Sequence, residues 1–141
     1  MNVQPYIDRL RATLTSMRLV GGAADFDAAL RGVLSTPSAF VIPLVERPID
    51  DSEDDYCGVG GTRNYFGVIL VVENHRDATG EASLVELEPI RRQVKAALRG
   101  WLPDSHGEPI KFVLGELVQA KGDAQLWWSD EFVDKRYRPL P

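Results

Sequence analysis

The chain has 141 residues and a mass of 15.7 kDa, which leaves room for one domain that buries roughly two-thirds of its unfolded surface. Hydrophobic residues make up 44% and charged residues 26%, close to the globular average, which argues against a disordered chain. With 16 bases against 21 acids, the net charge of −5 lacks the basic footprint of a dedicated nucleic-acid binder.

Cysteine count and apolar runs bear on the compartment. A single cysteine, Cys57, provides neither an internal disulfide nor a cysteine-only zinc site. The longest apolar run, Val68–Val72, is far shorter than the ~20 residues that a membrane helix needs. Asn2–Pro5 leads into a charged amphipathic stretch rather than the apolar core of a signal peptide. We therefore expect a protein made in the cytosol, with no membrane contact, no cofactor and no metal.

Two helices are predicted first. The apolar residues of the first recur at three- and four-residue spacing: Ile7, Leu10, Leu14 and Met17. Asn2 is its expected cap, and Gly21-Gly22 is its expected end. A second, shorter helix should be capped by Asp25 and stop before Pro37, which disfavours helical geometry in the preceding residue.

Two strands follow. The run from Ala39 to Arg47 is β-branched and apolar, and Pro43 inside it indicates an edge position or a bulge. Thr62 to Asn74 alternates strictly, with Phe66, Val68, Leu70 and Val72 on one side and Tyr65, Ile69 and Val71 on the other. Both sides are apolar, so another element should cover the second face.

The last third of the chain predicts a helix and a second hairpin. A helical stripe runs from Leu84 to Trp101, where Pro89 predicts either a start near Glu86 or a kink, and Gly100 fits the C-terminal cap. Two strands, 109–120 and 124–138, are joined by a Gly-Asp turn. Two hairpins linked by a helical crossover predict an α+β fold: a four-stranded, mainly antiparallel sheet with N-terminal helices, in one domain over residues 1–141.

An acidic run accounts for the whole net charge. It consists of Asp50, Asp51, Glu53, Asp54 and Asp55, and outside it the count is 16 bases against 16 acids. Carboxylates bind Ca²⁺ or Mg²⁺, but the EF-hand spacing is not met. Adjacent acids more often stay solvated, or they become ordered against a basic partner.

No motif predicts a catalytic site. The stretch Cys57–Gly61 resembles a phosphate loop in composition, but an acidic run precedes it and a strand follows it, where a phosphate loop has a strand and then a helix. His75 and His106 fall in predicted turns without a Cys or His at ligand spacing, and a nucleophile elbow is absent.

Two further groups are candidate interface residues. Arg91, Arg92, Lys95 and Arg99 form a basic group, and residues 91, 95 and 99, four apart, line one helix face. The group indicates a solvated face, pairing with an acidic loop of another subunit or, third, contact with DNA phosphates. Trp127 and Trp128 are adjacent in a strand and should point to opposite faces. One of them is then expected in the core and the other exposed at an interface, with base stacking as a weaker alternative.

Several segments resemble one known family. They are Phe40–Arg47, Tyr65–Val72, Asn74–Glu81, Leu98–Trp101 and Leu126–Phe132. This ordered set is similar to the tail terminator (tail completion) proteins of long-tailed phages and prophages, over roughly residues 38–138. The resemblance implies a virion protein that assembles into a hexameric ring on the head-proximal end of the tail tube, stops tube polymerisation and meets the head–tail connector or stopper. It also implies that DNA passes through the ring without sequence-specific binding.

Other functions stay open on sequence grounds. A head–tail connector or stopper, or a tail-tube subunit, would be structural proteins of related kind. A small metal-dependent enzyme would use the carboxylates of Asp50–Asp55, and a DNA-binding module would use the basic helix face.

Overall fold

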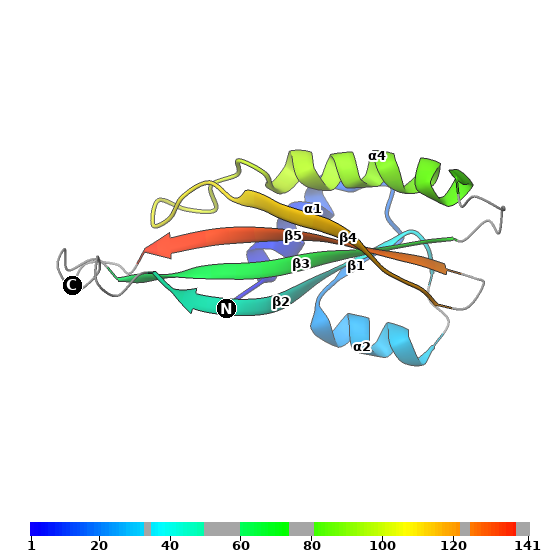
Figure 1. Cartoon of the computed structure of the whole chain (residues 1–141), viewed down its shortest axis with the longest axis horizontal. Coiled ribbons are helices and arrows are strands. Elements are labelled where there is room, and N and C mark those ends of the chain that lie inside the picture. The colour runs from blue at the N-terminus through cyan, green and yellow to red at the C-terminus, as the bar shows by residue number, and fades with distance from the viewer. Residues whose placement is uncertain (33–34, 50–59, 74–80, 122–124, 138–141) are drawn as a thin grey trace.

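The structure is a computed structural model that describes residues 1–32, 35–49, 60–73, 81–121 and 125–137; the acidic run, Cys57 and His75 lie outside these residues. A long twisted sheet has helices on both of its faces (Figure 1). Its elements in chain order are α1 (Gln4–Thr13), β1 (Leu19–Gly21), α2 (Ala23–Arg31), β2 (Ser38–Pro48), β3 (Gly61–Glu73), α4 (Glu81–Leu98), β4 (Lys111–Lys121) and β5 (Gln125–Tyr137).

The sheet has five strands in the order β1-β2-β3-β5-β4. The hairpins β2–β3 and β4–β5 are antiparallel and are connected through α4, as predicted. The prediction of four strands was wrong, because β1 adds a fifth that pairs in parallel with the start of β2. A strand of three residues is too short to show alternation, and its Gly21 was interpreted as the end of the first helix, which stops at Thr13.

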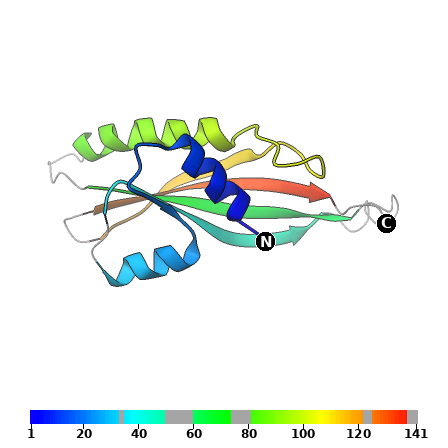
Figure 2. The ribbon, with the colours of Figure 1, turned by 180° about the vertical axis from the view of Figure 1, so that it is seen from behind.

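One face of the sheet carries the main core. Here α1 and α4 lie side by side across the strands (Figure 2), so that Leu10 and Val94 pack over Phe66 and Leu70 of β3. All four side chains are fully buried, and each contributes about 1.5–3 kcal/mol by leaving water. Tyr6 stacks on Phe66 with ring centroids 4.0 Å apart. The core face that the alternation in β3 predicts is therefore confirmed.

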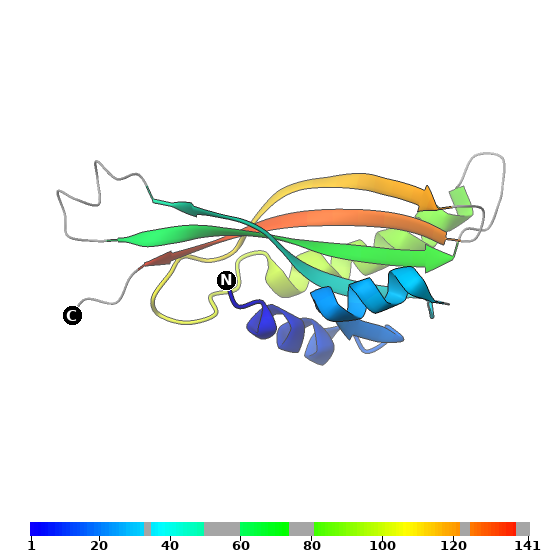
Figure 3. The same cartoon turned by 90° about the horizontal axis from the view of Figure 1, so that it is seen from below.

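The opposite face is covered by α2 at one end of the sheet (Figures 1 and 3). Phe40, Val71 and Trp127 are buried there, and the ring of Phe26 from α2 meets two of them edge-on, at 5.5 Å from Phe40 and 5.6 Å from Trp127. The prediction that another element covers the second face is confirmed for this end. Over the other end, none of the described helices covers the sheet.

Local signals place several boundaries. The register of β2 shifts between Pro43 and Val45, which is the bulge that the proline predicts. Gly100 has φ of +82°, a conformation that suits glycine after a helix. The helix α4 begins eight residues before Pro89 and runs through it, so of the two alternatives the start near Glu86 was wrong.

The cap of α2 also differs from expectation. Gly22 precedes the first turn, and Asp25 inside that turn accepts a hydrogen bond from the Gly22 amide at 2.9 Å. The aspartate therefore satisfies a backbone donor at the helix start, three residues later than a capping residue would stand. At α1, the Asn2 side chain accepts a hydrogen bond from the Gln4 amide at 3.0 Å, although the residue that immediately precedes the helix is Val3.

Candidate assembly surfaces

The edge strand β4 exposes an apolar surface. It is the last strand of the sheet and pairs only with β5, so its outer backbone edge has no strand partner among the described residues. Four aliphatic side chains along it are 40–54% exposed: Val113, Leu114, Leu117 and Val118. Monomers usually protect such an edge with prolines, charges or bulges. The strand β4 contains Lys111, Glu116 and Lys121 and two register shifts but no proline, and its aliphatic side chains stay exposed between the charges. A long apolar edge of this kind is typical of a protein interface.

The opposite edge of the sheet is only partly covered. Pairing with β1 ends at Phe40, and from Val41 onward β3 is the one described strand partner of β2. Leu44 and Val45 are exposed along this open half, at 50% and 40%. Pro48 closes the strand and has no amide hydrogen to donate. The sheet therefore ends in two apolar edges of different construction.

The predicted basic face of α4 points partly into the molecule. The Nη2 and Nε atoms of Arg91 donate to the Asp130 carboxylate on β5 at 2.9 and 3.2 Å, and the guanidinium lies 4.4 Å from the ring centroid of Trp128. Trp128 also donates to Asp130, at 3.0 Å. We call Arg91, Trp128 and Asp130 the anchor cluster, because it ties α4 to the sheet. The fully buried Asp130 carboxylate pairs with Arg91 inside its own subunit, and a role of Arg91 in subunit pairing stays a prediction.

A glycine makes room for the anchor cluster. A Cβ on Gly115 of β4 would lie 2.6 Å from a carboxylate oxygen of Asp130 and 2.7 Å from Nη2 of Arg91, closer than real Cβ atoms approach such groups. The edge strand can therefore pass beside the ion pair only because this position has no side chain.

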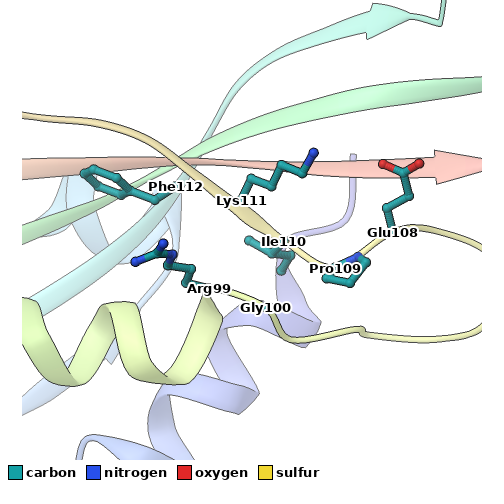
Figure 4. A pocket seen from close by; sticks show the side chains of 7 residues that line it. All are labelled: Arg99, Gly100, Glu108, Pro109, Ile110, Lys111 and Phe112. Carbon is teal, nitrogen blue, oxygen red and sulfur yellow. The ribbon is translucent and has the colours of Figure 1, made fainter.

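The other three bases of the face are arranged differently. The Lys95 ammonium lies 4.3 Å from the ring centroid of Phe112, whereas Arg92 and Arg99 are exposed. Arg99 lines an open pocket of about 760 Å³ beside the start of β4 (Figure 4). In that view Arg99 lies on one side of the chain and Lys111 on the other, so the charged groups of the pocket do not converge on a common point.

The tryptophan pair points to opposite faces, as predicted. Trp127 is 5% exposed and packs beneath α2, while Trp128 is half-buried in the anchor cluster. The expectation of one exposed tryptophan was therefore wrong, because α2 and Arg91 each cover one of the two rings. A role for either residue in subunit contacts stays a prediction.

A group of buried polar side chains around Tyr6 of α1 was not predicted from the sequence. The Tyr6 hydroxyl donates to the Asp134 carboxylate at 2.5 Å, and Arg136 pairs with both Asp134, at 3.6 Å, and Asp104. Burial raises the pKa of Asp134 despite these partners, while burial and the bond to Asp134 raise the pKa of Tyr6. The hydrogen bond to Arg136 lowers the pKa of Asp104. These contacts join α1, the segment after α4 and β5, so their arrangement is structural.

Metal and membrane sites are not indicated in the described part of the chain. No group of three or more His, Cys, Asp or Glu side chains is placed to hold a metal ion there. His106 lies in the segment after α4, where its backbone carbonyl accepts a hydrogen bond from the Tyr137 amide. No described helix is long and apolar enough to cross a membrane.

The comparisons with known proteins give the family. Residues 1–137 match the family of phage tail terminator proteins. The chain belongs to the phage tail terminator family. Among solved structures, this terminator is similar to a chain in the virion of a native gene transfer agent particle, with a TM-score of 0.55 and 14% identity, over 94% of this chain and 92% of that one. None of the curated proteins matches the terminator in sequence. Family and fold agree with a structural component of a phage-type tail.

Proposed function

We propose that this terminator forms a ring, expected to be hexameric, on the head-proximal end of the tail tube. The ring stops tube polymerisation, presents a surface to the head–tail connector or stopper, and lets DNA pass through its channel. Membership of the tail terminator family supports this role. On this proposal the surfaces of the subunit carry the function, and the protein has no catalytic activity.

The open apolar edge of β4 is the observation that carries the proposal. Each pair of neighbours from β2 to β3, β5 and β4 is antiparallel, so β2 and β4 run in opposite directions at the two sides of the sheet. In a head-to-tail ring, β4 of one subunit faces the open half of β2 in the next. The two strands then pair antiparallel, and their exposed leucine and valine side chains leave water together.

Electron microscopy with purified tail tubes tests the proposal. Wild-type protein should appear as rings and should cap tube ends, and tube lengthening should stop. Replacing Leu117 and Val118 by lysine puts two charges into the proposed contact, so rings and caps should be lost.

Val85→Lys is the matched control, because Val85 is 71% exposed and belongs to α4 rather than to either edge strand. It should assemble as the wild type does. The proposal is wrong if wild-type protein leaves tube ends uncapped, and if it lengthens the tubes instead, the protein is a tube subunit.

A further inference from the structure

A row of basic side chains crosses the sheet on the same face as α2, at the end that α2 does not cover. Arg47 of β2 stands directly opposite Arg63 of β3, which stands directly opposite Lys135 of β5. Directly opposed residues of antiparallel strands share a face, with Cβ atoms roughly 4.5–5.5 Å apart, and like charges in such pairs destabilise the sheet. Two successive like-charged pairs in register are therefore unfavourable unless an anion compensates them.

Lys111, at the start of β4, extends this row to the sheet edge. It is paired with Val133, two residues from Lys135 on the same face. A groove of about 220 Å³ is lined by Arg63, Lys111 and Lys135, together with Tyr65, Glu108, Pro109 and Val133. We call Arg47, Arg63, Lys111 and Lys135 the basic row.

One carboxylate in the groove cannot balance these charges. Glu108 accepts a hydrogen bond from the Tyr137 hydroxyl at 2.6 Å and lies 3.8 Å from the Lys135 ammonium. Its pKa is lowered, first by the bond from Tyr137 and then by the charges of Lys135, Lys111 and Arg63. Among the residues that line the groove, Glu108 is the one acid beside three bases, Arg63, Lys111 and Lys135. Within the described part of the chain, Arg47, Arg63 and Lys111 form no ion pair.

The same chain contains an acidic segment of matching chemistry. The run Asp50–Asp55 holds five acids, and the remaining residues are balanced at 16 bases to 16 acids. Arginine guanidinium groups bind carboxylates through two parallel hydrogen bonds, and lysines add further charge-assisted bonds. The surplus on the row therefore calls for an acidic peptide, and the chain supplies one.

We infer that the basic row of one subunit binds the acidic run of the neighbouring copy in the ring. This rests on the proposed function, because it needs a head-to-tail assembly in which one patch meets a different patch. Lys111 connects the row to the proposed contact, since it begins the edge strand β4. The row runs across four strands, roughly 14 Å at the usual spacing. The Ile49 amide donates to the Gly61 carbonyl at 3.2 Å, so the pairing of β2 with β3 extends past Arg47 and Arg63 to the last described residue before the acidic run.

Charge reversal with mixing tests the inference. One variant carries Arg47→Glu, Arg63→Glu and Lys135→Glu; a second carries lysine at all five acids of the run. Each alone should need at least about tenfold more protein to form rings in sedimentation experiments, because close charge pairs at interfaces couple strongly.

An equal mixture of the two variants should recover ring formation. Each acidic run then meets a basic row, and each reversed run meets a reversed row, in alternation around an even-numbered ring. Arg31→Glu is the control, because Arg31 lies on the exposed side of α2 and should not affect assembly.

The outcomes separate this inference from the proposed function. Normal ring formation by the row variant would overturn the docking site and leave the ring proposal intact. Loss of assembly that mixing does not repair would show that the run and row pair within one subunit, or that they do not pair. If the row variant assembles normally but loses salt-dependent binding to duplex DNA, the row contacts phosphates instead. A wild-type protein that forms no rings contradicts the proposed function itself.

Discussion

Replacing Arg91 by methionine tests whether a buried ion pair holds α4 on the sheet. The substitution keeps the apolar stem but removes the guanidinium whose contacts with Asp130 are 2.9–3.2 Å long. Asp130 is fully buried, so its carboxylate would keep the indole N–H of Trp128 but lose its counter-charge. Breaking one side of a buried pair costs about 3–5 kcal/mol. The lower value is the more fitting one here, since the arginine side chain is 15% exposed.

Urea denaturation measures this loss. At about 3 kcal/mol, and with a slope of ~1–3 kcal/mol per molar, the midpoint should fall by about 1–3 M. Arg92→Met changes the next residue, which is exposed, and should stay within about 0.5 kcal/mol of wild type. Adding Asp130→Asn to Arg91→Met should recover part of the stability, because a neutral amide costs less to bury than a charge. A loss no larger than that of Arg92→Met would refute the anchoring role.

Three other substitutions probe the rest of the fold. Burial raises the pKa of Asp134, so the stability that this group contributes is full below its ordinary pKa of 3.8 and is lost as the pH rises. The free energy of unfolding of Asp134→Asn should therefore rise relative to wild type above pH 3.8 in urea titrations. A difference that stays constant with pH would contradict this. Gly115→Ala places a methyl group against the anchor cluster and should cost about 1–3 kcal/mol in thermal unfolding, whereas Gly32→Ala, which meets only an atom 3.9 Å away, is its tolerated counterpart. Phe26→Ala should expose the ring of Trp127 and shift its fluorescence to the red; an unchanged spectrum would show that α2 does not cover that ring.

The strongly periodic parts of the fold were predictable from sequence. The alternation in β3, the apolar stripe of α4 and Gly100 after it each predict one local backbone conformation, and the structure agrees with each prediction. The fifth strand was not predictable in this way. Its three residues, Leu19–Gly21, form a strand because β2 offers a parallel partner, and pairing of that kind depends on tertiary structure rather than on local pattern.

The candidate surfaces show a similar division. Spacing grouped Arg91 with the other bases of α4, but only the fold reveals that Arg91 pairs with the buried Asp130 of β5. Likewise, the basic row joins residues that are far apart in sequence and meet only through strand register: Arg47 and Arg63 across one hairpin, Lys135 from another. The acidic run can be recognised in the sequence, but the bases proposed to bind it can be identified only when the neighbouring strands are known.

The short strand β1 would affect how neighbouring subunits of the proposed ring align along their strands. Strands β2 and β4 have 11 residues each, but β1 occupies the first three residues of β2, from Ser38 to Phe40. The β4 strand of a neighbouring subunit can therefore pair with only the remaining eight residues of β2, and three residues of β4 in every subunit should extend beyond this pairing. Repeated around the proposed ring, this offset would make the two rims unequal. One rim would carry the unpaired backbone of β4 and could accept a further strand, whereas the other rim would have none. A protein that caps one end of a tube needs two rims that differ in this way.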